Sequence, residues 1–226
     1  GMMLRWKGKK VVYDVHEDLP RQILTKPWIN PFLRRIVSAC SSAVENIGVR
    51  FFNGVVAVTP TIAKRFPKNK TAVVYNYPIL GELAAVDSVP YSKRAPIAIY
   101  VGGITMIRGI KEMVEAVGLI PRQFDVRLVL AGNITEKDVE EATNTADPRV
   151  DFIGWQSREQ VAKLLGRSRI GFVLFHPAPN HVDALPNKLF EYMSAGLPVL
   201  ASDFPLWRKI IGDLGCGTLV DPQDPK

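Results

Sequence analysis

One short segment of the chain brings together an amide, an ammonium group and two carboxylates. Asp183 is followed after seven intervening residues by Glu191, and Asn187 and Lys188 lie between them. Pro186 suits the first turn of a helix, which then presents Asn187, Lys188 and Glu191 on a common face. A carboxylate there can accept hydrogen bonds from neighbouring sugar hydroxyls, and a lysine near the helix N-terminus complements phosphate charge. The segment therefore suits a ligand that carries both hydroxyl and phosphate groups.

A second segment joins a strand to a helix through a glycine-containing turn. Gly102 and Gly103 follow the strand, and Arg108 and Gly109 open the helix. Glycines let the backbone approach an anion, which the unpaired N–H groups at a helix N-terminus can bind. Arg108 adds a planar guanidinium that can grip a diphosphate through two hydrogen bonds. The alternative is a tight turn beside a solvated arginine. The spacing fits neither a P-loop nor the dinucleotide-binding fingerprint, which disfavours both classes.

The elements around these segments alternate between apolar β-rich runs and helical stretches. Strands are expected over residues 97–101, 126–131, 150–153, 170–175, 199–201 and 218–220. Helices are expected over residues 108–119, 135–145, 157–166, 187–195 and 205–211. Ser157 is the expected N-cap of one helix, and Leu189 and Met193 are the expected buried stripe of another. Such alternation predicts an α/β fold with a Rossmann-like, doubly wound parallel sheet.

The first part of the chain has the pattern of a partial second α/β unit. Strands at 10–15, 54–59 and 72–75 alternate with a long helix at 31–50 and a short one at 61–66. The expected apolar stripe of the long helix consists of Phe32, Ile36, Val37, Cys40, Val44 and Ile47. Three parallel strands are few for an independent domain. We expect a partial N-terminal domain at 1–76, a turn-rich linker at 77–95 and a second domain at 96–226.

The two chemical segments together resemble one enzyme family. Gly102-Gly103 and Arg108-Gly109 resemble the strand–turn–helix motif of retaining glycosyltransferases of the GT-B fold, family 4, also called glycosyl transferases group 1. Asp183-x7-Glu191 and the following Ser-Ala-Gly-Leu-Pro-Val resemble that family's E-x7-E and A-x-G-x-P-V elements. The resemblance covers residues 96–226 well and the first ninety residues more loosely. It implies a GT-B fold truncated at both ends, with an acceptor-side domain preceding the donor domain.

The resemblance also implies roles for individual residues. Arg108 and Lys188 would hold the donor diphosphate, Glu191 the nucleotide ribose, and Asp183 the donor sugar near the reacting centre. The implied donor-binding set is Gly102, Gly103, Arg108, Gly109, Trp155, Asn187, Lys188 and Glu191, with Trp155 beside the base.

Two further implied features concern the reacting centre. His16, after the first strand, would face the cleft and would be catalytic together with Asp183. Considered by itself, His16 fits a structural histidine better, and the resemblance makes the catalytic and the structural interpretations about equal. Many family members have arginine where Gly103 stands and glutamate where Asp183 stands, so one diphosphate cation is missing and the first acid is one methylene shorter.

The implied reaction is transfer of a hexose-type sugar from a nucleotide-diphosphate sugar to an acceptor, with retention of configuration. The expected acceptor is a polysaccharide or a lipid-linked glycan, and neither a metal ion nor a cofactor is expected. The alternative is a non-catalytic nucleotide-sugar-binding fragment, or one part of a split glycosyltransferase. A GT-B sugar-nucleotide epimerase fits these motifs less well.

Charge is distributed unevenly along the chain. The net charge is +7, but 14 lysines and arginines against 6 acidic residues lie up to Lys93, and 15 against 16 follow. A basic segment attracts anionic partners, so an anionic membrane surface or a lipid-linked acceptor is expected near it. No RNA- or DNA-binding signature is present, which disfavours nucleic acid. Trp28, Phe32, Phe51 and Phe52 favour helix packing over a membrane-facing patch.

The apolar runs, the cysteines and the histidines of the sequence indicate where the protein is located and whether it binds a metal ion. No apolar run approaches the ~18 residues of a spanning helix, and no signal-peptide pattern begins the sequence. Cys40 and Cys216 have no paired spacing and are expected to be small buried side chains. A cytoplasmic protein is expected, peripheral to the inner membrane face at most. His176, His181 and Asp183 do not have an established metal-ligand spacing, so no metal site is predicted.

Overall fold

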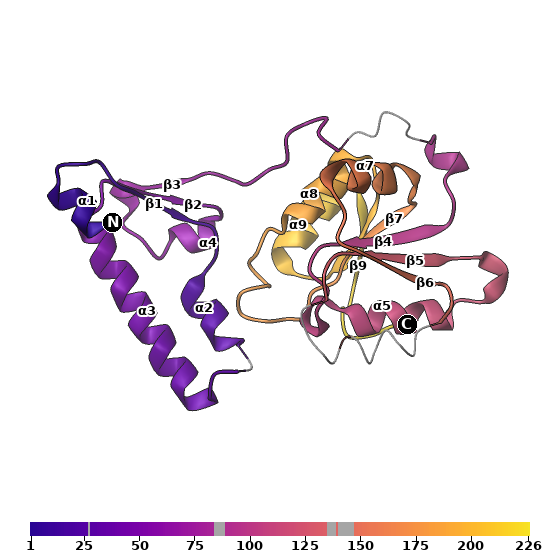
Figure 1. Cartoon of the computed structure of the whole chain (residues 1–226), viewed down its shortest axis with the longest axis horizontal. Helices are drawn as coiled ribbons and strands as arrows, with labels where there is room; N and C mark the ends of the chain where they lie inside the picture. The colour runs from indigo at the N-terminus through magenta and orange to yellow at the C-terminus, as the bar shows by residue number, and fades with distance from the viewer. Residues whose placement is uncertain (27, 84–88, 135–138, 140–146) are drawn as a thin grey trace. The chain divides into compact units, whose positions relative to one another are not determined.

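The computed structural model describes the chain except for residues 27, 84–88, 135–138 and 140–146, and it divides into two compact units (Figure 1). The first unit contains residues Gly1–Asn76 and Pro177–Leu185, and the second contains Tyr77–His176 and Pro186–Lys226. Residues 77–95, expected as a linker, therefore belong with the second unit. The short segment 177–185, expected within the second domain, belongs with the first.

The first unit is built on a parallel three-stranded sheet in the order β1-β2-β3. Its strands are β1 (Val12–Val15), β2 (Gly54–Ala57) and β3 (Thr71–Val73). Its helices are α1 (Met2–Trp6), α2 (Leu19–Leu24), α3 (Pro31–Phe51), α4 (Pro60–Ala63) and the 3-10 turn η1 (Lys68–Lys70). A small core of Val15, Val49, Val55, Ala57, Ile62 and Phe66 holds these elements together. The three strands, α3 and α4 match the expected elements, whereas α1 and α2 were not predicted.

The long helix α3 turns a different face inward from the one expected. Its buried residues are Glu45, Gly48 and Val49, while Phe32 is 73% exposed. Much of the predicted stripe, including Cys40, is exposed in the described structure. The reason is an ion-pair cluster: Arg65 binds both Glu45 and Asp18, and the Tyr13 hydroxyl donates to Glu45 Oε1 at 2.7 Å. These polar contacts orient α3 over the sheet.

The second unit contains a parallel six-stranded sheet in the order β6-β5-β4-β7-β8-β9, which confirms the doubly wound, Rossmann-like prediction. Its strands are β4 (Ile97–Val101), β5 (Arg127–Ala131), β6 (Val150–Gly154), β7 (Ile170–Val173), β8 (Val199–Ser202) and β9 (Gly217–Val220). Its helices are α5 (Ile110–Leu119), α7 (Arg158–Arg167), α8 (Asn187–Ser194) and α9 (Pro205–Leu214), with 3-10 turns η2 (Tyr91–Lys93), η3 (Met106–Arg108) and η4 (Arg122–Phe124). The helix expected at 135–145 lies almost entirely outside the described residues.

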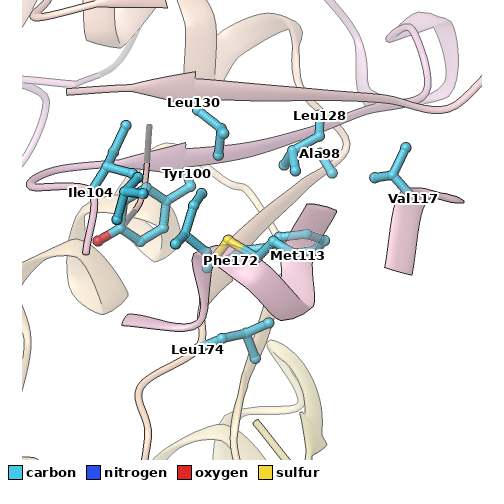
Figure 2. Packing of buried hydrophobic residues seen from close by; sticks show 11 residues of the cluster. Ala98, Tyr100, Ile104, Met113, Val117, Leu128, Leu130, Phe172 and Leu174 are labelled. Carbon is cyan, nitrogen blue, oxygen red and sulfur yellow. The ribbon is translucent and has the colours of Figure 1, made fainter. Parts of the chain in front are cut away.

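Helices cover both faces of this sheet (Figure 1). Helix α5 packs on one face, and α7, α8 and α9 lie on the other. Figure 2 shows Met113 and Val117 of α5 meeting side chains of β4, β5 and β7 in the larger core. Strand β7 ends at Val173, two residues earlier than expected, because the Phe175 N–H donates to the Ser202 hydroxyl at 2.7 Å instead of continuing the ladder. Because the sheet is packed on both faces, the carboxyl ends of its strands are held in fixed positions.

Candidate functional site

The Gly102–Gly103 turn lies at the point where the strand order reverses. β4 has β5 on one side and β7 on the other, so the chain leaves β4 at a topological switch point. Ligands of open α/β sheets bind at this place, outside the carboxyl ends of the strands. Gly102 has a φ of 131°, and a Cβ there would lie 3.1 Å from the Lys188 ammonium nitrogen. Glycine at this position thus lets the backbone approach a cation from another element.

Lys188 is buried beside this turn. It is the second residue of α8, and its side chain packs against two aromatic rings. Its Nζ lies 3.7 Å from the Tyr100 ring centroid and 5.4 Å from the Phe175 ring centroid. The residue is only 9% exposed. Among the described residues, Nζ has no hydrogen-bond acceptor. A buried ammonium group without an acceptor is costly, so this arrangement calls for an anion.

Arg108 is the second cation at the turn. Its Nη1 donates to the Gly103 carbonyl at 3.1 Å, and the Tyr100 hydroxyl donates to the same carbonyl at 2.8 Å. Its guanidinium carbon lies 5.7 Å from the Phe175 ring centroid, so Arg108 and Lys188 contact one ring. A Cβ on Gly103 would lie 2.9 Å from Arg108 Nη1 and would displace it. Gly109 follows with a φ of 72° and is the N-cap of α5.

Burial and the neighbouring charges shift the titration of this cluster. Burial, and next the charge of Arg108, hold the pKa of Lys188 well below its ordinary value, while Glu191 acts in the opposite direction. Burial raises the pKa of Tyr100 to about 12, so its hydroxyl keeps its proton at neutral pH. Two cations placed together with little compensating charge form an electrostatic site for a multiply charged anion.

The other predicted donor-binding residues also belong to the second unit. Glu191 lies one helical turn after Lys188 on α8, with its side chain 16% exposed and its Oε1 accepting a 2.7 Å hydrogen bond from Arg158. Asn187 is exposed at the start of α8. Trp155 is 69% exposed in the loop after β6, where a flat ligand group could stack on it. Tyr192, and not Met193, joins Leu189 in the buried stripe of α8.

The two residues predicted to be catalytic lie in the first unit. His16 follows β1, and its exposed ring Nε2 is 2.9 Å from Asp14 Oδ2. Asp183 forms a 2.8 Å ion pair with Nη1 of Arg21, which is also near the Asp18 carboxylate. The carboxylate of Asp183 is thus engaged by a cation that sequence reasoning did not identify. The catalytic roles of both residues stay predictions.

The described residues contain no cluster of three or more histidine, cysteine or acidic side chains that could hold a metal ion. In the disfavoured histidine set, His176 Nε2 lies 3.1 Å from Glu112 Oε1, and Asp183 pairs with Arg21.

Several residues of the site were missed by the sequence analysis. Tyr100 and Phe175 supply the rings around Lys188, and Tyr192 accepts a 2.9 Å hydrogen bond from the Val101 N–H. Arg158 binds Glu191. Tyr100 lies two residues before Gly102, and Tyr192 directly follows Glu191, so their aromatic character beside the motifs was the available signal. Phe175 and Arg158 carry no comparable signal because only the fold brings them to the site.

Comparison with known proteins decides the family. Residues 86–226 match the family described as Glycosyl transferases group 1. The chain belongs to this family. Membership of this family, expected from the two motifs, is therefore confirmed over the segment that carries them. No curated protein sequence matches the chain.

Several solved structures share the fold. HepE from Anabaena, solved with UDP-glucose, superposes with a TM-score of 0.71 at 16% identity, covering 99% of this chain and 62% of that one. Sucrose-phosphate synthase from Thermosynechococcus elongatus gives a TM-score of 0.64 at 21% identity, covering 100% and 58%. WaaG, described as involved in lipopolysaccharide biosynthesis, gives 0.58 at 18%, covering 75% and 50%. The likeness confirms the GT-B fold class, and the chain spans about three fifths of the first two relatives.

Proposed function

We propose that the second unit binds a nucleotide-diphosphate sugar and that the chain takes part in retaining sugar transfer to an acceptor. The observation that carries this proposal is the buried Lys188 ammonium, which has no acceptor among the described residues and lies beside Arg108 and the Gly102–Gly103 turn. A diphosphate supplies the anion that this site calls for. The crystal structures of HepE with UDP and with UDP-glucose support the same ligand class.

Each donor-site residue then has a physical role. Arg108 and Lys188 bind the diphosphate, the exposed ring of Trp155 stacks on the base, and Glu191 accepts hydrogen bonds from ribose hydroxyls. As the bond to the sugar breaks, the leaving diphosphate gains negative charge, which the two cations stabilise where it develops. The leaving phosphate can accept the acceptor's proton, so no side-chain nucleophile is needed. Neither a metal ion nor a cofactor enters this scheme.

Calorimetry of one variant tests the donor site. Arg108→Ala should weaken binding of UDP-, GDP- or ADP-glucose, whichever the wild type binds, by about 1.5–3 kcal/mol, as expected for a lost charge-assisted hydrogen bond. Arg122→Ala, which removes an exposed arginine of η4, is the matched control and should bind like the wild type. Equal affinity of Arg108→Ala and wild type for every donor that binds would refute the assignment.

A second candidate is a nucleotide-sugar-binding module without transferase activity of its own, either a remnant or one part of a split enzyme. It is favoured by the ion pair between Asp183 and Arg21, which engages the carboxylate expected near the donor sugar. Both candidates predict donor binding, and only the first predicts turnover. Release of the nucleoside diphosphate from a bound donor, in the presence of a pool of polysaccharide and lipid-linked acceptors, distinguishes them.

We further propose that the first unit attaches peripherally to an anionic membrane at its cytoplasmic face, close to a lipid-linked acceptor. None of the described helices is long and apolar enough to cross a bilayer. Helix α3 instead exposes Phe32, Ile36 and Val44, with Arg34 and Arg35 in the same helix. Apolar and basic side chains together bind anionic lipid surfaces.

Vesicle sedimentation tests this attachment. The protein should sediment with phosphatidylglycerol-containing vesicles and remain in the supernatant with pure phosphatidylcholine, and Phe32→Ser should reduce sedimentation because it removes an exposed apolar anchor. Phe124→Ser removes a similarly exposed ring from η4 in the second unit and should leave sedimentation unchanged. Sedimentation that does not depend on anionic lipid contradicts the proposal.

A further inference from the structure

The guanidinium of Arg158 joins two carboxylates from different parts of the second unit. Its Nε and Nη2 donate to Glu82 Oε1 and Oε2 at 3.1 and 3.0 Å, and its Nη1 donates to Glu191 Oε1 at 2.7 Å. Glu82 precedes β4 in the sequence, Arg158 is the first residue of α7, and Glu191 lies on α8. One side chain thus connects three separate segments around Glu191.

Local structure holds each member of this triad in place. Ser157 and Gln160 form a capping box that fixes the start of α7, where Arg158 lies. Leu83 is 1% exposed, so its burial anchors the neighbouring Glu82. The hydrogen bonds that Arg158 donates to Glu82 and, with a smaller effect, to Glu191 raise the pKa of Arg158 above its ordinary value. The guanidinium is therefore charged throughout the physiological range.

The way Glu82 binds Arg158 decides what Glu191 can do. Glu82 occupies the Nε and Nη2 edge of the guanidinium, so only Nη1 reaches Glu191. The hydrogen bond from Arg158 ends on Oε1 of Glu191, so the other carboxylate oxygen, Oε2, is not engaged by this guanidinium. One oxygen of Glu191 is thus fixed by Arg158, and the other remains an acceptor for a ligand hydroxyl.

We propose that Arg158 is a positioning residue that orients the ribose-binding carboxylate of Glu191, and that Glu82 keeps Arg158 from engaging both oxygens of that carboxylate. The inference rests on the proposed function, because it concerns the ribose of a bound nucleotide. Without Glu82, the guanidinium can rotate and pair with Glu191 through two parallel hydrogen bonds, which is the favoured arginine–carboxylate geometry. Those bonds would compete with the ribose hydroxyls. Without Arg158, Glu191 loses its fixed orientation.

Calorimetric titrations with and without a ribose in the ligand test the inference. Wild type, Glu82→Gln, Arg158→Gln and Glu191→Gln are titrated with UDP, GDP and ADP, and with inorganic pyrophosphate, which contacts only the diphosphate site. We expect nucleotide binding to weaken about tenfold in Arg158→Gln and Glu191→Gln and a few-fold in Glu82→Gln, the size of one hydrogen bond. Pyrophosphate binding should stay unchanged in Glu82→Gln and Arg158→Gln.

A double variant and a matched control separate positioning from general structural damage. In the Glu191→Gln background, Glu82→Gln should have no further effect, since both act through the same carboxylate. Glu159→Gln makes the same change at an exposed glutamate of α7 that pairs with Lys163, and it should bind all ligands like the wild type.

Three results overturn the inference. Equal weakening of pyrophosphate and nucleotide binding would mean that Arg158 and Glu82 act on the diphosphate site or on folding. Unchanged nucleotide binding in Glu82→Gln and Arg158→Gln, with a wild type that binds, would overturn the positioning role and leave the proposed function intact. A wild type that binds neither nucleotides nor pyrophosphate would overturn both.

Discussion

The buried charge of Lys188 is expected to lower the stability of the ligand-free protein and to favour the binding of an anionic ligand. Its ammonium group is held between the Tyr100 and Phe175 rings, without a hydrogen-bond acceptor among the described residues. Replacing an uncompensated buried charge by an apolar side chain of similar length commonly stabilises a protein. The same replacement removes a cation from the proposed diphosphate site. Stability and affinity should therefore change in opposite directions at this one position.

Lys188→Met should raise the free energy of unfolding of the ligand-free protein by about 1–4 kcal/mol while weakening nucleoside diphosphate binding about tenfold or more. Urea denaturation and calorimetry measure the two effects. Lys209→Met removes an exposed lysine of α9 and should change neither quantity by more than about 0.5 kcal/mol. A less stable Lys188→Met protein would show that an unseen interaction compensates the charge.

The same lysine predicts a pH dependence with a definite sign. Because the folded-state pKa of Lys188 lies below its ordinary value of 10.5, the unfolded chain binds a proton between these two values that the folded chain does not. The free energy of unfolding contributed by this group therefore rises with pH through that window. The difference in stability between Lys188→Met and wild type should accordingly shrink as pH approaches 10.5. An unchanged difference would contradict the lowered pKa.

At the scale of elements, a hydrogen bond joins α8 to the end of β4. The Val101 N–H donates to the hydroxyl of the buried Tyr192 at 2.9 Å, which joins the helix carrying Lys188 to the strand leading into Gly102. Tyr192→Phe keeps the ring but leaves that N–H without its acceptor. We expect a loss of about 1–3 kcal/mol in the free energy of unfolding, measured by urea denaturation.

Tyr91→Phe is the matched control for this change. The Tyr91 hydroxyl donates to the Arg169 carbonyl at 3.1 Å on an exposed surface, where water can replace it. Its loss should therefore cost much less. If both tyrosine variants lost the same stability, the anchoring role of Tyr192 would be wrong.

The elements that the sequence predicts well are those whose pattern depends only on local neighbours. The strand over 97–101 and the helix capped by Ser157 follow from apolar runs and a capping residue, and both are present as β4 and α7. The inward face of α3 could not be predicted, because Glu45 is buried by Arg65 and Tyr13, which are distant in the sequence. The partners of Asp183 and Glu191 were missed for the same reason, since Arg21 and Arg158 meet them only in the fold.

At the scale of the whole molecule, positively charged side chains are distributed in two different ways. The excess of lysine and arginine lies up to Lys93, mostly in the first unit, whereas the cations of the candidate donor site, Arg108 and Lys188, lie in a stretch with 15 basic and 16 acidic residues. The positive electrostatic potential of the candidate donor site therefore comes from the placement of two side chains and not from the overall composition. The excess in the first unit suits attraction to an extended anionic surface.

The two units should also differ in stability, because their cores differ in size. The first unit has a three-stranded sheet over a small core and an α3 with many exposed apolar side chains. The second has a six-stranded sheet covered on both faces. Local opening requires little free energy where few apolar contacts are lost. Amides of β1, β2 and β3 should therefore exchange hydrogen faster than those of β4, β5 and β7, as measured by mass spectrometry of peptic fragments.

Adding UDP, GDP or ADP should change hydrogen exchange in only one unit, because a ligand stabilises the unit that binds it. At 100 times its dissociation constant a ligand adds about 2.7 kcal/mol to the stability of its binding unit. Exchange should slow at β4, β7 and α8, which surround Lys188, and stay nearly constant at β1 to β3. The Arg108→Ala protein, tested at the same nucleotide concentration, should show less slowing because less of its site is occupied. Protection confined to β1 to β3 would place the nucleotide site in the first unit and contradict its assignment to the second.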